Sequence, residues 1–339
     1  MLAIVERVSI TVSATSGLRR NAVKREFERF MSKRGVIIAN TGTPDVPEAD
    51  VVRAYLAEFL QDPRICPLPA PLWKIILHAF ILPKRAHASA EKYRQIWTSQ
   101  GSPLQSGMAS LAHKLQASFN EQDKATLVQH GMSYGSPSIE QALGELKAEG
   151  CDELVVLSLY PQNALSTTGV VADKTLAALN ALDWHPQTKL VGYYSAHLLY
   201  LEAITASIRA AGFDSSAGDK LLFAFHSIPV RDIRNGDDYE DKARATANAV
   251  ARLLELDVQD WALGFQCRFD KARSWLGPFI PEALRTLGTP RGRLFVVAPN
   301  FSIDCLETLY DIDIELRQQV CEDPALQIES DRFVYVPCL

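Results

Sequence analysis

The chain has 339 residues, of which 47% are hydrophobic and 22% are charged, and its formal net charge is −5 at pH 7. This balance is typical of a globular protein, and the length allows two ordinary domains whose cores need no disulfide bonds. The excess of acidic residues argues against a nucleic-acid-binding protein, which would normally present a basic face.

Residues 1–34 form an N-terminal tail that is more basic than the rest of the chain. The tail carries eight lysines and arginines against three glutamates, and it has no apolar run long enough for a secretory signal peptide. Two explanations stay open: an arginine-rich transit peptide, or a start codon assigned too early, since Met31 stands just before the first predicted strand. In either case we expect a disordered tail outside the folded domains.

The predicted strands are short apolar runs that alternate with longer amphipathic stretches. They cover residues 35–40, 125–130, 153–160, 189–194, 220–226, 261–266 and 294–298. Helices are predicted between them, for example over 138–149, where Ser138 can cap the start and Gly150 can end it. This alternation is typical of parallel sheets flanked by helices, so the sequence predicts an α/β fold.

The strands fall into two groups, which predict two Rossmann-like domains facing each other across a cleft. We place the first domain at residues 35–168 and the second at residues 169–325. The remaining segment, 326–339, is expected to return to the first domain.

The segment 71–83 is the most apolar stretch of the chain, although Lys74 and His78 interrupt it. It falls short of the roughly 18 consecutive apolar residues that a membrane span requires. It is therefore either a partly buried helix or an amphipathic patch that makes peripheral contact with a membrane surface.

The cysteines are scattered singly along the chain, and no two of them form a C-x-x-C pair. They are Cys66, Cys151, Cys267, Cys305, Cys321 and Cys338. This spacing excludes a zinc ribbon and a redox dithiol of the usual kind. Scattered single cysteines fit a reducing compartment, so we expect a cytoplasmic protein, with or without the peripheral membrane contact.

Candidate sites lie just after the predicted strands, because ligands of parallel sheets collect at the carboxyl ends of the strands. The turn at residues 40–45, NTGTPD, lacks the glycine spacing and the lysine of a phosphate-binding loop. The loop at residues 160–169 carries three hydroxyl side chains and a glycine. It can cap the next helix, or it can present backbone N–H groups to a carboxylate.

His226 ends an apolar strand, which is a position where a ligand would sit. Because histidine exchanges protons near neutral pH, the residue is a candidate for proton transfer, with a purely structural role as the alternative. Glu307, Asp311 and Glu315 recur every four residues and therefore share one face of a predicted helix. Such a row is either a solvated helix face or a set of partly buried carboxylates that can shuttle protons or hold a hard cation.

From Gly35 to Leu339 the chain resembles the ferrochelatases, enzymes that insert ferrous iron into a porphyrin to make haem. The resemblance rests on eleven segments that occur in the right order: NTGTPD, YLAEFLQDPR, ILPKRAHASAEKYRQIW, GSPL, GMSYGSPSIE, LYPQNALSTTG, FHSIP, GDDYEDK, FQCRF, WLGP and DCLETLYDIDIE. Any one of them would be weak evidence, whereas the ordered set is specific.

The resemblance implies a lyase of haem biosynthesis with a chelatase-like fold, porphyrin and Fe(II) as its substrates, and no organic cofactor. It marks His226 and Glu307 as the catalytic residues and as ligands at the metal-insertion site. It places Asp311 and Glu315 on an acidic path that leads away from Glu307. The porphyrin pocket is implied to be lined by Tyr134, Ser166, Thr167 and Trp275.

Some positions depart from the family pattern. Cys267 and Asp270 stand where many relatives have serine and glycine, and Cys305 replaces a residue that is histidine in some members. Some relatives carry an iron–sulfur cluster, but none is expected here, because a cluster needs about four cysteine ligands and the C-terminal region offers only Cys321 and Cys338.

Two alternatives to an iron-inserting enzyme stay open: a chelatase for another metal or tetrapyrrole, and a porphyrin- or haem-binding protein without turnover. The segments YPQ-x3-STTG and WLGP favour protoporphyrin over coproporphyrin as the substrate. In such an enzyme His226 would accept pyrrole protons or guide the metal, and Glu307 with its row would carry charge away from the ring.

Overall fold

The computed structural model describes residues 32–122, 125–266 and 273–339. Most of the predicted N-terminal tail therefore lies outside the described residues, as do Cys267 and Asp270. Among the described helices, none is both long enough and apolar enough to cross a membrane.

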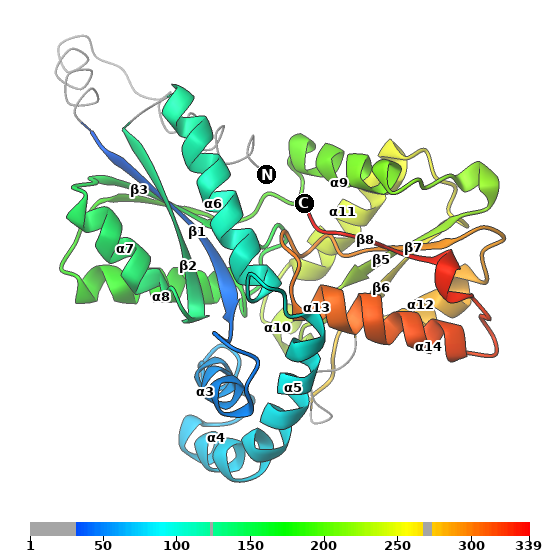
Figure 1. The fold of residues 1–339 in the computed structure, drawn as a ribbon, viewed down its shortest axis with the longest axis horizontal. Helices are drawn as coiled ribbons and strands as arrows, with labels where there is room; N and C mark the ends of the chain where they lie inside the picture. Colours follow the sequence, from blue (N-terminus) through cyan, green and yellow to red (C-terminus); the bar gives the residue numbers. More distant parts are fainter. Residues whose placement is uncertain (1–31, 123–124, 267–272) are drawn as a thin grey trace.

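Two parallel sheets of four strands each form the centre of the molecule, which confirms the predicted α/β fold (Figure 1). The first sheet has the order β2-β1-β3-β4, with β1 (Arg34–Thr43), β2 (Thr126–Gly135), β3 (Glu153–Ser158) and β4 (Gln187–Val191). The second has the order β6-β5-β7-β8, with β5 (Lys220–Phe225), β6 (Trp261–Phe265), β7 (Leu294–Val297) and β8 (Phe333–Val336).

Helices cover both faces of each sheet and build a separate lobe below the first one (Figure 1). The lobe contains α3 (Ala49–Leu60), α4 (Ala70–Ile76), a π-helical turn η1 (Leu77–Ile81) and α5 (Leu82–Ile96). Around the first sheet lie α6 (Pro103–Gln122), α7 (Ile139–Ala148) and α8 (Thr168–Ala181). The helices of the second half are α9 (Leu198–Ala210), η2 (Ser215–Ala217), α10 (Val230–Arg234), α11 (Tyr239–Leu253), α12 (Ile280–Leu287), α13 (Leu306–Thr308), η3 (Leu309–Leu316), α14 (Arg317–Glu322) and η4 (Ser330–Arg332).

The strands are buried on both faces, which explains their continuous apolar runs. In β1, Val36 and Ile38 join a core that also contains Phe223 of β5 and Phe295 of β7. The alternate residue Ile37 faces a second core formed with α7 and α8. One hydrophobic core thus runs through both halves of the molecule and fixes the two sheets relative to each other.

Local signals in the sequence account for several helix boundaries. Ser138 accepts a hydrogen bond from the backbone N–H of Gln141, whose side chain in turn accepts one from the Ser138 N–H. This reciprocal pair is a capping box, and it satisfies two N–H groups at the start of α7 that have no helical partner. The predicted helix start at Ser138 is confirmed.

Two of the predicted domain boundaries are wrong. The boundary at residues 168 and 169 fails because β4, at Gln187–Val191, pairs in parallel with β3 and so extends the first sheet. The segment 326–339 does not return to the first sheet, because its strand β8 pairs in parallel with β7 along the edge of the second. The four-residue run Phe333–Val336 is short but aromatic and β-branched, which suits an edge strand.

Candidate active site

His226 follows β5 directly and lies at the carboxyl end of the second sheet. Its Nδ1 atom is 2.7 Å from the carbonyl oxygen of Ser227. Because a carbonyl oxygen only accepts, Nδ1 must carry the hydrogen, and in the neutral ring the Nε2 atom is left as the free acceptor. The backbone is fixed as well, since the Tyr239 hydroxyl donates to the His226 carbonyl at 2.9 Å.

Glu307 belongs to α13, the short helix that follows β7, and Gln266 ties it to the end of β5. The Gln266 backbone N–H donates to the Phe225 carbonyl at 2.7 Å, and its side-chain amide donates to the Glu307 carbonyl at 3.2 Å. Gln266 therefore joins the strand end that carries His226 to the helix turn that carries Glu307. These residues follow three neighbouring strands, β5, β6 and β7, so they gather at the carboxyl end of the second sheet.

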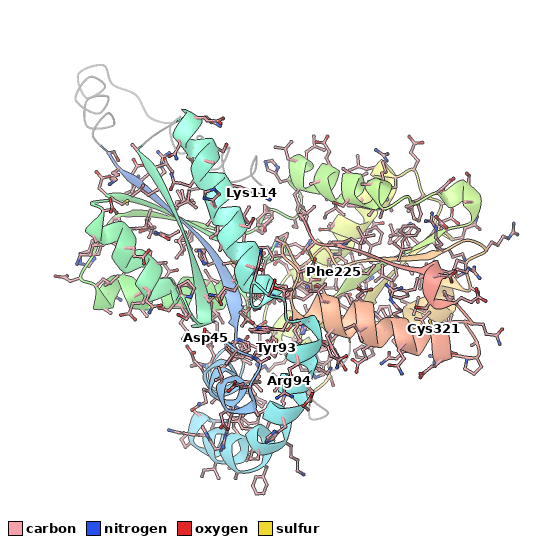
Figure 2. The ribbon with its side chains drawn as sticks, in the orientation of Figure 1. Asp45, Tyr93, Arg94, Lys114, Phe225 and Cys321 are labelled. Atoms are coloured by element: carbon pink, nitrogen blue, oxygen red, sulfur yellow. The ribbon has the colours of Figure 1, made fainter. Side chains whose placement is uncertain are left out.

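The charge of Glu307 acts on buried tyrosines that come from the first half of the molecule. Burial is the main reason that the pKa of Tyr93 is raised, and the negative charge of Glu307 is the next cause. Burial also raises the pKa of the Cys305 thiol, again with Glu307 as the next contribution. Figure 2 labels Tyr93, on α5, and Phe225, the residue before His226, near the middle of the molecule where the halves meet.

The first sheet presents its own strand ends to the same region. The Tyr160 hydroxyl donates to the Asn40 side-chain oxygen at 2.7 Å, so the ends of β1 and β3 are joined. Gly42 has a φ of +121°, and a Cβ atom there would overlap the carbonyl oxygen of Tyr134. The glycine in NTGTPD is thus explained by close packing of β1 against β2 and not by phosphate binding.

Glu307, Asp311 and Glu315 form one continuous row, as predicted, but the helix is of a different type. Residues 309–316 form a π-helix, in which backbone bonds join residues five apart. The nearby charge of Glu307 contributes to a raised pKa of Asp311, for which burial is the main cause. Asp311 and Glu315 share one ion-pair partner, so they lie on the same side of η3. The row is partly buried, which contradicts a fully solvated helix face.

Trp275 lies beside the segment that follows His226. It forms an antiparallel bridge with Pro229, and the Leu276 N–H donates to the Ile228 carbonyl at 3.0 Å. This pairing holds Trp275 close to the segment that follows His226. The resemblance alone had pointed to this residue.

Tyr134, Ser166 and Thr167 lie on the side of the first sheet. Tyr134 is buried at the end of β2, and its ring packs edge-on against Phe59. Ser166 and Thr167 belong to the turn before α8, where the Thr167 hydroxyl bonds to the backbone of Ala164. It makes no capping bond to α8, so the simple helix-cap explanation of this loop is wrong for Thr167.

A cavity of 280 Å³ opens between the two halves, next to the loop that contains Ser166 and Thr167. Its walls include Asn163, Leu165 and Thr168 from that loop and Asp237 from the segment before α11, but neither His226 nor Glu307. Among the described residues, no group of three or more His, Cys, Asp or Glu side chains is arranged to hold a metal ion. The metal-binding role of His226 and Glu307 therefore stays a prediction.

Sequence reasoning missed two residues of this site, Gln266 and Tyr93, as functional positions. Both lie inside segments that carry the family resemblance, FQCRF and the EKYRQIW end of the segment at residue 81. Their roles depend on contacts between remote parts of the chain, which no local pattern contains. Membership of a matching segment was the only signal available.

The chain is similar to known proteins over most of its length. The ferrochelatase family model matches residues 33–339. Curated ferrochelatases from Nitrosococcus oceani, Aromatoleum aromaticum and Nitrosomonas europaea are 37%, 39% and 40% identical; the alignments cover 91% of this chain and 83%, 83% and 84% of those proteins. Among solved structures, SirB from Bacillus subtilis with Fe3+ matches with a TM-score of 0.50 at 11% identity, over 90% of this chain and 89% of that one, and supports the fold alone. With its two parallel sheets and this match over nearly its whole length, the chain belongs to the ferrochelatase family.

Proposed function

We propose that this ferrochelatase inserts Fe(II) into protoporphyrin IX and that His226 and Glu307 act on the reacting centre. The observation that carries the proposal is the bond from His226 Nδ1–H to the Ser227 carbonyl. It leaves Nε2 as the one ring nitrogen with a free lone pair, and it orients the ring at a strand end.

Metal insertion requires that the porphyrin lose two N–H protons while the metal ion sheds its water. His226 Nε2 can accept a pyrrole proton or guide the metal, because a neutral imidazole does both near neutral pH. Glu307 lies four residues before Asp311, and the row continues to Glu315. Carboxylates in such a row can pass a proton or a hard cation onward, so the row would carry charge between the ring and the outside.

The porphyrin would lie against Tyr134, Ser166, Thr167 and Trp275. A ring held in a buckled shape exposes the lone pairs of its nitrogens, so binding that distorts it brings it closer to the transition state. Of these four residues, Trp275 has the strongest structural support as a porphyrin contact. Its backbone pairs with Pro229, which holds it next to the segment that follows His226.

The substrate is tested by comparing kcat/KM for protoporphyrin IX with that for coproporphyrin III, using anaerobic Fe(II) with the full-length protein. We expect protoporphyrin to be preferred. Preference for coproporphyrin would overturn the substrate assignment, and activity with a sirohydrochlorin but with neither of these porphyrins would favour a chelatase for another ring.

We further propose that the protein works in the cytoplasm and touches the membrane surface through the segment 71–83. Leu77 and Leu82 are buried within the helical lobe, whereas Ile75 and Phe80 are 65% and 69% exposed. Lys74 and Lys84 flank these apolar side chains, and basic residues beside an apolar face favour contact with anionic lipid.

The membrane contact is tested by co-sedimentation with vesicles that contain an anionic lipid. We expect the Ile75→Ser, Phe80→Ser double variant to bind these vesicles more weakly than the wild type. Val258→Ser, which changes an exposed apolar residue beyond α11, serves as the control. Equal sedimentation of the double variant and the wild type would contradict the proposal.

A further inference from the structure

Lys92 of α5 reaches from the helical lobe to the acidic row on η3. Its Nζ atom lies 3.0 Å from Asp311 Oδ1 and 3.6 Å from Glu315 Oε2. It also lies 4.5 Å from the centre of the Tyr310 ring, within the range of a cation–π contact. One ammonium group is thus held by three side chains of the same short helix.

The triad is only partly open to water. The side chains of Lys92, Asp311 and Glu315 are 33%, 28% and 40% exposed. Burial lowers the pKa of Lys92, but Asp311 and Glu315 more than offset this, so the pKa of Lys92 is raised overall. The ammonium therefore stays charged, and it neutralises part of a row that would otherwise carry three negative charges from Glu307, Asp311 and Glu315.

Two carboxylates that hold one cation between them are chemically suited to a hard divalent metal ion, because such ions prefer several oxygen ligands. In this protein the cation between them is a side chain of the chain itself. A metal ion that passes along the row therefore meets two carboxylates that are already occupied and would not be retained tightly.

We propose that Lys92 is a positioning residue for metal transfer, whose ammonium occupies the place between Asp311 and Glu315 that a divalent cation would otherwise take. The row then guides an incoming ion towards Glu307 and does not store it. This inference rests on the acidic path of the proposed function, which it deepens by assigning a residue that regulates the path.

The experiment measures Mn2+ binding to the full-length protein without porphyrin, by the loss of the free-ion electron paramagnetic resonance signal. We expect Lys92→Met to bind one Mn2+ more than the wild type, or to bind it about tenfold more tightly, because affinity for hard cations rises with the net negative charge of their ligands. Lys92→Arg keeps the charge and should bind as the wild type does. Lys114→Met, which removes an exposed lysine of α6 that has no part in the proposed sites, is the matched control.

Steady-state insertion of Zn(II) gives a second measurement. If Lys92 had only a structural role, its replacement would not lower both KM for Zn(II) and kcat. Retained metal should lower both KM for Zn(II) and kcat in Lys92→Met, and Lys92→Arg should restore both. The added Mn2+ site should disappear in the Lys92→Met, Asp311→Asn double variant. If Lys92→Met does not fold, Lys92→Gln keeps a hydrogen-bond donor without the charge and takes its place.

A Mn2+ isotherm of Lys92→Met equal to that of the wild type would overturn the proposal. Lys92 would then have only a structural role, as an ion-pair partner that joins α5 to η3. This outcome is distinct from failure of the proposed function, because the Mn2+ measurement involves no turnover. Full activity of Glu307→Gln would remove Glu307 from catalysis while the Mn2+ result for Lys92 still stood.

Discussion

His226→Ala is expected to lower kcat by about 10²-fold or more, as is usual when a proton-transfer group is lost. The ring is oriented by the Ser227 carbonyl and lies at the end of β5, where its removal takes little from the core. Porphyrin should therefore still bind, and the free energy of unfolding should change little. The measurements are initial rates of Zn(II) insertion, porphyrin binding by fluorescence quenching, and denaturation by urea.

The control for this variant is His113→Ala, which removes an exposed histidine from α6. It should leave rate, binding and stability unchanged. If His226→Ala unfolds the protein, and a stabilising condition then restores its turnover, the structural explanation of His226 is right and the catalytic one is wrong.

Glu307→Gln is expected to abolish most turnover, with a loss of about 10²-fold or more in kcat. The amide keeps the shape of the side chain but removes the negative charge that contributes to the raised pKa values of Tyr93 and Cys305. Asp311→Asn and Glu315→Gln should each lower kcat less, because water molecules can replace the outer members of a row that conducts protons or ions. Initial rates for the three variants, measured side by side, give the comparison.

Glu329→Gln, at an exposed carboxylate before η4, is the matched control and should retain full activity. Activity of Glu307→Gln equal to that of the wild type would reject the assignment of Glu307. Equal losses in all three row variants would instead show that the carboxylates act as one unit in which no member can be bypassed.

The parts of the fold that sequence predicts well are those with a strong local pattern. The apolar run in β1 identifies a strand buried on both faces, since Ile37 and Ile38 pack into different cores. β8 was missed because four residues give little periodicity, and its partner β7 is chosen by long-range pairing. The predicted domain boundary at residues 168 and 169 is wrong for the same reason, because β4 belongs to the first sheet through its pairing with β3.

In the candidate site, too, a local pattern predicts one feature, whereas the others depend on contacts between remote segments. The four-residue spacing of Glu307, Asp311 and Glu315 correctly predicts one row of carboxylates, but it does not distinguish an α-helix from the π-helix that forms. The bridge made by Gln266 and the approach of Lys92 to Asp311 each join segments far apart in the chain. Such contacts follow from packing of the two halves, which no local pattern encodes.

We expect this chain to insert iron into a porphyrin at the strand ends around His226 and Glu307. The most direct test of this expectation is the absorbance spectrum of protoporphyrin IX incubated anaerobically with Fe(II) and the purified full-length protein. We predict that metalloporphyrin bands appear at a rate proportional to enzyme concentration and that His226→Ala and Glu307→Gln suppress this rate. Tight porphyrin binding by the wild type without any new metalloporphyrin band would contradict iron insertion by this chain.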